Sequence, residues 1–168
     1  VRVMIGQRTF IIAEPGSTHE GSLDEMYRLI DLAADAGANA IKFQWTSSAY
    51  LLAQRRRAYE YVKAYAKIEF PAAWHGLLRT HCEATGVEYL CTTYLPQDIA
   101  VVAADVSRFK IASFECDDDD FIAQHFPFGK RLKHFAFFAI QSVKRRRNVL
   151  ENSNFTDFKS TVFHGPAS

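Results

Sequence analysis

The sequence predicts a parallel α/β fold: a TIM-type (β/α) barrel that is truncated to about four βα units. Short apolar runs alternate with amphipathic helical segments over roughly the first 130 residues. No glycine-rich dinucleotide turn follows any of these runs. A hydrophobic content of 48% in 168 residues is enough for a folded core. An open doubly wound sheet is the alternative.

Each expected strand is a short apolar run, which is typical of a strand buried in a parallel sheet. The first run is rich in β-branched residues and stops before Glu14-Pro15-Gly16. The four expected strands are residues 9–13, 39–43, 87–91 and 108–112.

Helix signals separate these strands. Ser22 followed by two acidic residues is typical of a helix start, and Gly37 of a helix end. Pro71 and Pro96 each stand where a first helical residue is expected. The expected helices are residues 22–37, 53–67, 71–86, 96–104 and, with a weaker pattern, 119–125.

The pattern changes after Gly129. Residues 131–141 fit either a fifth strand or a helix, and residues 148–168 are polar without a clear period. We therefore expect two parts: residues 1–130 as the N-terminal half of a barrel, and residues 131–168 as a divergent segment with a loose tail. A half-barrel leaves open strand edges and an apolar inner face, so self-association through the edges is expected.

Composition excludes several classes of protein. Lys and Arg total 20 against 19 Asp and Glu, a net charge of +1 that argues against a nucleic-acid-binding protein. No apolar run is long enough for a transmembrane helix, and no signal peptide is recognisable, so no membrane association is expected. Three cysteines at irregular spacing fit reduced thiols, which favours a cytoplasmic location.

Polar side chains lie at the carboxyl end of every expected strand, where the active sites of βα proteins lie. Seven candidate site residues share this position: Glu14, Lys42, Gln44, Thr92, Lys110, Ser113 and Glu115.

Lys42 and Lys110 are the most informative of these residues, because each stands inside an apolar strand. A buried ammonium group costs several kcal/mol unless it is paired. Two lysines with a threonine and a serine around one cavity would suit a phosphate or a carboxylate. Glu14 and Glu115 could pair with the lysines or accept protons. A purely structural pairing of each lysine with a buried acid is the alternative.

Four other features have ordinary explanations. A loop-ordering hydrogen bond is favoured for His19, and a small buried residue for Cys91. The basic run at residues 55–57 is expected to be a solvated helix face, and the acidic run at residues 117–120 a loop and helix start.

Four segments resemble the sialic acid synthase family, which makes N-acetylneuraminic, pseudaminic and legionaminic acids. They are FIIAEPGSTHEG (10–21), AGANAIKFQ (36–44), WHGLLRTHCEATGVEYLCT (74–92) and RFKIASFE (108–115). The resemblance covers about residues 8 to 130, and the four segments occur in the family's order.

The resemblance implies condensation of phosphoenolpyruvate with an N-acetylamino sugar, such as N-acetylmannosamine, to a nine-carbon 2-keto acid with release of phosphate. It gives Glu14 a role in water activation or substrate positioning. Lys42 and Lys110 would grip the carboxylate and phosphate, and Thr92 and Ser113 would donate hydroxyl hydrogen bonds to the same ligand. Gln44 and Glu115 would face the sugar or the metal.

The chain also departs from the family pattern. The family uses a divalent metal (Mn or Mg) held by two histidines from the half of the barrel that has no counterpart here, so no metal ligand is assigned. Pro15 and Thr93 replace an aliphatic residue and a proline. Two alternatives stay open: a truncated non-catalytic remnant or ligand-binding half-barrel, and another phosphoenolpyruvate-using or Schiff-base aldolase barrel with Lys42 or Lys110 as the amine.

Overall fold

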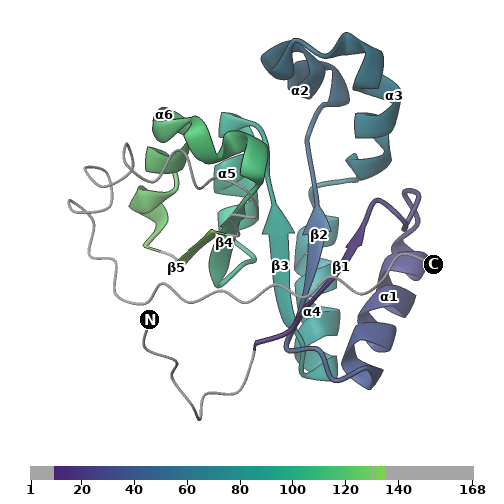
Figure 1. Ribbon diagram of the computed structural model, residues 1–168. Helices are drawn as coiled ribbons and strands as arrows, with labels where there is room; N and C mark the ends of the chain where they lie inside the picture. The colour runs from purple at the N-terminus through teal and green to yellow at the C-terminus, as the bar shows by residue number, and fades with distance from the viewer. Residues whose placement is uncertain (1–9, 130, 135–168) are drawn as a thin grey trace, which may run out of the picture.

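A computed structural model describes residues 10–129 and 131–134, which form one parallel sheet with covering helices (Figure 1). The strands pair in the order β1-β2-β3-β4-β5, and each pair is parallel. They are β1 (Ile12–Gly16), β2 (Ala40–Gln44), β3 (Glu88–Thr92), β4 (Arg108–Ile111) and β5 (Arg131–His134). An order without a reversal is that of a singly wound barrel, whereas a doubly wound sheet would show a switch point.

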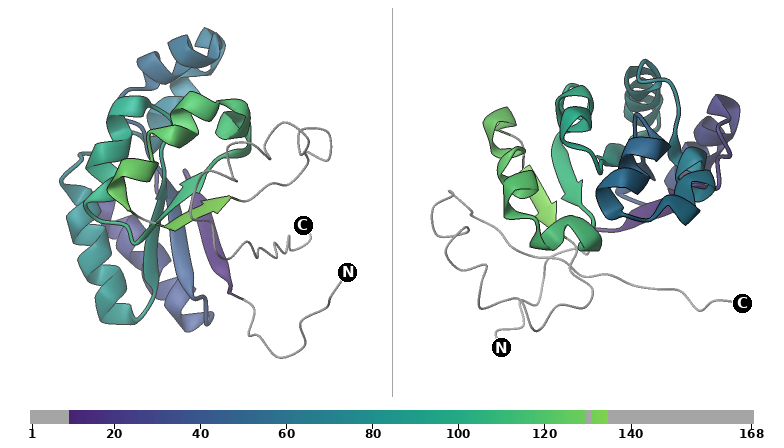
Figure 2. Two further views of the ribbon diagram at one scale, coloured as in Figure 1. Left: turned by 90° about the vertical axis from the view of Figure 1, so that its left-hand side faces the viewer. Right: turned by 90° about the horizontal axis from the view of Figure 1, so that it is seen from above.

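Most of the helices lie on one side of this sheet, as the view from above in Figure 2 shows. The α-helices are α1 (Leu23–Asp35), α2 (Ala49–Arg56), α3 (Val62–Tyr65), α4 (Trp74–Thr85), α5 (Pro96–Ala103) and α6 (Asp119–Ala123). Short 3₁₀ turns are η1 (Tyr59–Tyr61), η2 (Ala66–Ile68), η3 (Ser113–Asp117) and η4 (Phe126–Phe128). Helices on one side and strands in sequence order are the arrangement expected of consecutive βα units.

Helix α1 shows how the sequence signals act. The Ser22 hydroxyl accepts a hydrogen bond from the Glu25 backbone N–H at 3.3 Å, which caps the helix start. Met26, Ile30 and Ala33 recur on one face and are buried against the sheet. Gly37, with φ of +76°, then turns the chain toward β2.

The core lies between the sheet and the helices. Alternate residues of the middle strands pack against Met26 and Ile30 of α1, Leu78 of α4 and Val102 of α5. These strand residues are Ile41, Phe43, Tyr89, Cys91, Phe109 and Ile111. Because successive side chains of a strand point to opposite faces, their neighbours face the inner side of the sheet.

The inner side is more polar than the sequence led us to expect. It carries Lys42, Gln44 and Lys110. It also carries an ion pair in which the Arg108 Nε lies 2.5 Å from Glu88 Oε1. The Arg108 guanidinium also lies 4.9 Å from the ring centroid of Phe10, next to β1. Since β1 and β4 are not neighbours in the sheet, this contact shows that the sheet curves. The described residues thus do not form the apolar inner face that was expected to favour self-association. Self-association through the strand edges stays a prediction.

Strand β1 lies three residues later than expected and includes Pro15 and Gly16. Among the described residues β1 pairs with β2 alone, so Pro15 stands in an edge strand, where its missing N–H is tolerated. The register between β1 and β2 shifts between Ala13 and Gly16, and Gly16 has φ of +61°. The bulge lets the strand continue past the point where the apolar run stops.

The helix expected over residues 53–67 is wrong in its extent. The Ser48 hydroxyl caps α2 by accepting from the Leu51 N–H at 3.3 Å, so the helix begins before residue 53. Arg57 has φ of +52°, which ends α2 after only eight residues. Two 3₁₀ turns and α3 fill the rest of the segment, which lies above the carboxyl ends of the strands (Figure 1).

The sheet continues past residue 130. Residues 131–134 form β5 in parallel register with β4, so the strand interpretation holds there. The rest of 131–141 and the tail at 148–168 lie outside the described residues. The described chain is therefore a parallel sheet with the strand order of a barrel, in which β1 and β5 form the two edges.

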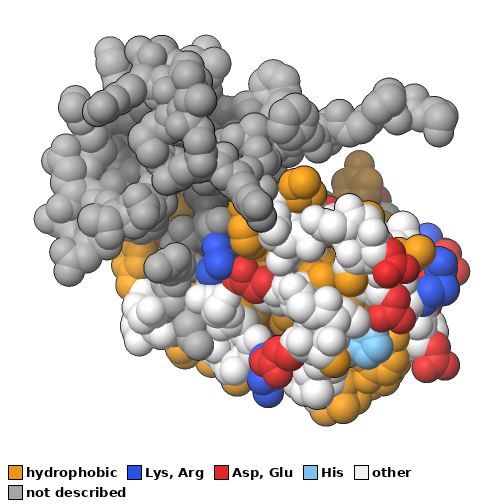
Figure 3. Space-filling view, turned by 90° about the horizontal axis from the view of Figure 1, so that it is seen from below, with side chains coloured by type: hydrophobic (Ala, Val, Ile, Leu, Met, Phe, Trp, Pro, Cys, Tyr) orange, Lys and Arg blue, Asp and Glu red, His pale blue; other side chains and the backbone are white. Residues whose placement is uncertain are grey.

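The end of the sheet opposite the α2–α3 segment is shown from below in Figure 3. Hydrophobic side chains there are interspersed with acidic and basic ones. In the part of the chain that the structure describes, no helix has the length and apolar character needed to cross a membrane.

Candidate functional site

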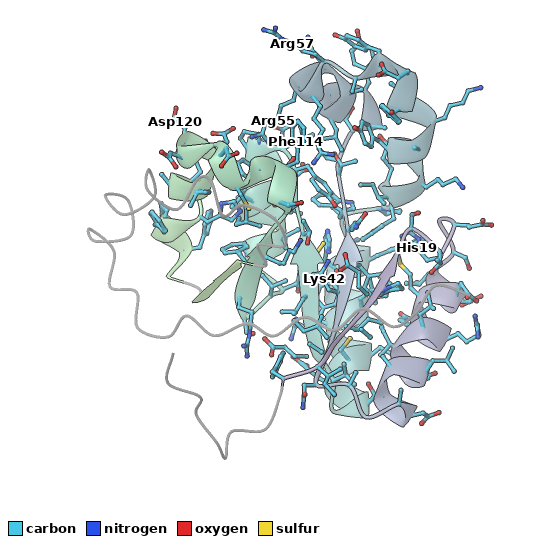
Figure 4. All side chains as sticks on the ribbon, in the orientation of Figure 1. His19, Lys42, Arg55, Arg57, Phe114 and Asp120 are labelled. Carbon is cyan, nitrogen blue, oxygen red and sulfur yellow. The ribbon has the colours of Figure 1, made fainter. Side chains whose placement is uncertain are left out.

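Lys42 lies at the centre of the candidate site, on the inner face of β2 (Figure 4). Its side chain is only 3% exposed, and its ammonium forms an ion pair with Glu14 of β1. The Gln44 Nε2 lies 3.3 Å from the same carboxylate oxygen. Neighbouring strands thus bring together three of the residues that the sequence identified as site residues.

Glu14 is held in its charged form. Burial alone would raise the pKa of this carboxyl group, but the charges of Lys42 and Lys110 and the hydrogen bonds from Lys42 and Gln44 lower it overall. The Glu14 side chain is 47% exposed, so it is also open to solvent or a ligand.

Lys110 brings a second cation to the same place. It lies on β4 in register with Thr92 of β3, which is itself in register with Gln44 of β2. Burial, followed by the charge of Lys42, lowers the pKa of Lys110 from 10.5 to about 8. Glu14 and Glu115 act in the opposite sense. Burial and the neighbouring Lys42 charge thus both disfavour the charged form of Lys110.

The Thr92 hydroxyl completes the group. Its Oγ1 is buried and has no hydrogen-bond partner among the described residues. A buried hydroxyl without a partner is unfavourable unless a ligand or a water molecule satisfies it. We define Glu14, Lys42, Thr92 and Lys110 as the strand-end cluster, which has one positive charge in excess and one free hydroxyl donor. Such a group can bind a small anion.

Ser113 and Glu115 differ in their exposure to solvent. Ser113 is exposed at the start of η3, directly after β4. Glu115 is 2% exposed, and its Oε1 pairs with Arg56 of α2. The alternative of a structural pairing with a buried acid does not describe Lys42, because its partner Glu14 is half exposed. The buried acid Glu115 pairs with an arginine and not with a lysine.

Two arginines that the sequence does not single out as site residues belong to this end of the sheet. Arg56 pairs with Glu115, and Arg55 lies 2.6 Å from Asp118 Oδ2 and donates to the Tyr94 carbonyl. The prediction of a solvated helix face is therefore wrong for these two and agrees only with the exposed Arg57. Their partners are 59 and 63 residues away in the chain, a separation that no local pattern reveals.

Three smaller predictions are confirmed. His19 Nδ1 accepts a hydrogen bond from the Gly21 N–H at 3.1 Å and orders its loop. Cys91 is buried, and burial raises the pKa of its thiol to about 12, as is typical of a structural cysteine. Asp118 accepts from the Phe121 N–H at 2.9 Å and starts α6.

The described residues do not offer a site for the divalent metal. Within 10–129 and 131–134, no group of three His, Cys, Asp or Glu side chains could hold a metal ion. No chemical step is therefore assigned to a metal bound by these residues.

Comparison with known sequences agrees with the geometry. The model of the NeuB family matches residues 29–134. Spore coat polysaccharide biosynthesis protein SpsE of Bacillus subtilis (strain 168) is 36% identical over 122 residues, which cover 63% of this chain and 31% of SpsE. Pseudaminic acid synthase of Campylobacter jejuni (strain 81-176) is 30% identical over 131 residues, or 69% of this chain and 37% of that protein. The chain thus spans about a third of the length of these relatives.

Solved structures of related synthases have a similar fold. An N-acetylneuraminic acid synthetase from Leptospira borgpetersenii superposes with a TM-score of 0.73 at 26% identity, over 86% of this chain and 50% of that one. A truncated 3-deoxy-D-arabino-heptulosonate 7-phosphate synthase from Thermotoga maritima superposes with a TM-score of 0.55 at 9% identity, over 79% of this chain and 44% of that one, which shows a shared fold alone. The family model covers most of the sheet and its candidate residues from Lys42 to Glu115, and the chain belongs to the NeuB family.

Proposed function

We propose that the strand-end cluster binds phosphoenolpyruvate, and that the chain contributes this site to a NeuB-type synthase. The reaction would be condensation of phosphoenolpyruvate with an N-acetylamino sugar, N-acetylmannosamine or a relative. The observation that carries the proposal is the excess positive charge at Lys42 and Lys110 next to the free Thr92 hydroxyl. The names of the pseudaminic and legionaminic acid synthases among the relatives support the class of product.

The proposed reaction forms one carbon–carbon bond and breaks one carbon–oxygen bond. The methylene carbon of phosphoenolpyruvate forms a bond to the aldehyde carbon of the open-chain sugar. Water adds to the enol carbon, the bond from that carbon to the phosphate oxygen breaks, and phosphate leaves. The product is a nine-carbon 2-keto acid.

The residues of the cluster suit separate parts of this reaction. Lys42 and Lys110 would hold the carboxylate and phosphate and stabilise the charge on the leaving group. Glu14 is charged and half exposed, so it can accept a proton from the attacking water. Ser113 would add a hydroxyl donor, and Gln44 and Glu115 would face the sugar. We expect the manganese or magnesium ion implied by the resemblance to need ligands from outside the described residues.

The first test is a thermal unfolding scan and a calorimetric titration with phosphoenolpyruvate, using the full chain. A ligand that binds only the folded state stabilises it by about 2.7 kcal/mol at a hundredfold excess over Kd. Lys42→Met and Lys110→Met should each raise the Kd at least 100-fold. Lys63→Met is the matched control, because it removes one exposed lysine of α3. Unchanged binding by both site variants would exclude the cluster as the site.

A second candidate follows from Lys110. A lysine whose pKa is lowered to about 8 is partly uncharged near neutral pH, as the amine of a Schiff-base aldolase must be. The Lys110 amine would then condense with the keto carbon of pyruvate with loss of water, and borohydride would reduce the C=N bond to leave a 1-carboxyethyl group on Lys110, which mass spectrometry of peptides detects. A cooperative unfolding transition with neither phosphoenolpyruvate stabilisation nor pyruvate trapping would favour the non-catalytic remnant.

A further inference from the structure

The carboxylate of Glu115 is held in an unusual way. Both the Nε and the Nη2 of Arg56 donate to the same oxygen, Oε1, with the Nε at 3.1 Å. An arginine commonly meets a carboxylate as a fork that uses both oxygens. Here Oε2 is left buried and without a hydrogen-bond partner among the described residues. Only 2% of the Glu115 side chain is exposed, so this oxygen lacks a donor in a place where water does not readily supply one.

Arg56 is itself fixed by its surroundings. Its side chain is 15% exposed, and its guanidinium carbon lies 4.6 Å from the ring centroid of Phe114 and 4.9 Å from that of Tyr94. A third ring, that of Tyr65, lies at 5.6 Å. Guanidinium groups are attracted to aromatic faces at these distances. These contacts favour the observed orientation of the guanidinium, in which both of its donors reach Oε1.

Glu115 lies near the strand-end cluster. It follows β4, the strand of Lys110, by four residues, and its charge raises the pKa of Lys110. Phosphoenolpyruvate has no good hydrogen-bond donor at neutral pH, so a free carboxylate oxygen does not suit it. The hydroxyl and acetamido N–H groups of an amino sugar are donors of the kind that Oε2 lacks.

We propose that Arg56 is a positioning residue, which holds Glu115 so that Oε2 stays free to accept a hydrogen bond from the amino sugar. This inference rests on the proposed function and adds to it a residue of the α2–α3 segment. Under this proposal the α2–α3 segment affects the affinity for the sugar, whereas residues of the strand-end cluster bind phosphoenolpyruvate.

The test uses the full chain and two separate ligands. Calorimetry gives the Kd for phosphoenolpyruvate alone, and saturation-transfer NMR with saturating phosphoenolpyruvate gives the Kd for N-acetylmannosamine and a 2,4-diacetamido hexose. Arg56→Gln should raise the sugar Kd about tenfold or more and leave the phosphoenolpyruvate Kd within twofold. Arg56→Lys restores the charge but donates from one point, so it should raise the sugar Kd about threefold. Arg57→Gln is the matched control, because the labelled Arg57 side chain points away from the molecule in Figure 4.

The outcomes separate the two proposals. Wild-type protein that does not bind phosphoenolpyruvate contradicts the proposed function. Wild-type protein that binds phosphoenolpyruvate but neither sugar contradicts the role of Glu115 Oε2. Sugar binding by Arg56→Gln equal to that of the wild type contradicts the role of Arg56. Should Arg56→Gln fail to unfold cooperatively, Arg56→Lys decides: a threefold weaker sugar Kd supports positioning, and an unchanged one overturns it.

Discussion

Two groups of charged side chains lie near the carboxyl ends of the strands, and they differ in charge balance. The strand-end cluster has two lysines and one glutamate. The second group, which we call the arginine cluster, has Arg55 and Arg56 with Glu115 and Asp118. The first retains one positive charge in excess, and the second is neutral.

The pKa shifts follow this difference. In the strand-end cluster, burial and repulsion by Lys42 lower the pKa of Lys110 to about 8. In the arginine cluster, burial alone would lower the pKa of Arg56, but Glu115 and Tyr65 raise it overall. An unbalanced group of buried charges is less stable without a ligand of opposite charge, whereas a balanced group stabilises the fold as it is. Charge balance therefore distinguishes the candidate anion site from a cluster whose charges are already paired.

The largest expected effect is on the arginine cluster. Glu115→Gln removes the negative charge and leaves Arg56 without a counter-ion, so we expect the free energy of unfolding to fall by about 2–4 kcal/mol. Urea denaturation measures it. The double variant Arg56→Met/Glu115→Leu should recover most of the loss, because it removes both charges. A loss below about 0.5 kcal/mol in Glu115→Gln would show that the pair is not structural.

Lys110→Met should change the free energy of unfolding in the opposite direction. The folded protein binds a proton at Lys110 less readily than the unfolded chain, so below pH 8 the charged lysine destabilises the fold. Replacing it should raise the free energy of unfolding at pH 7 by about 1–2 kcal/mol, less than the full shift because water still reaches the side chain.

The pH dependence gives the control for Lys110→Met. From pH 8 to about 10.5 the wild type loses this proton only in the folded state, so its stability rises with pH and the advantage of the variant disappears. Urea denaturation at pH 7 and pH 10 compares the two. An advantage that is the same at both pH values would contradict the assignment of this titration to Lys110.

Glu14→Gln should have the smallest effect. Removing the carboxylate next to Lys42 takes a negative charge away from the proposed anion site, so phosphoenolpyruvate should bind about two- to fivefold more tightly. Stability should change by less than about 1 kcal/mol, since the side chain is 47% exposed. Calorimetry measures the Kd, and weaker binding would mean that Glu14 holds Lys42 in place for the ligand.

Much of the strand-end cluster could be predicted from the sequence. Lys42 and Lys110 are conspicuous because each interrupts an apolar strand, and parallel strands place their carboxyl ends side by side. Parallel βα units and the cap at Ser22 also follow local rules and are confirmed. These features depend on residues that are near in sequence or on a fixed geometry of neighbouring strands.

The arginine cluster could not be predicted in this way. Arg55 and Arg56 resemble any exposed basic helix end, and their partners follow β4, two strands further along the sheet. The end of β1 also differs from the prediction, because the strand continues through Pro15 to Gly16. A proline usually ends a strand, but an edge strand with a bulge can include one. In both places the deciding interaction is tertiary, and the local sequence is compatible with more than one outcome.

The alternation along β2, β3 and β4 has a consequence for mutational tolerance. In all three strands the odd-numbered residues face the helices, so the even-numbered ones face the inner side. A saturation scan of residues 40–44, 88–92 and 108–111 should therefore give two profiles that are out of phase. Polar substitutions at odd positions should abolish folding, whereas many substitutions at the even positions 42, 92 and 110 should leave the protein folded and unable to bind its anion.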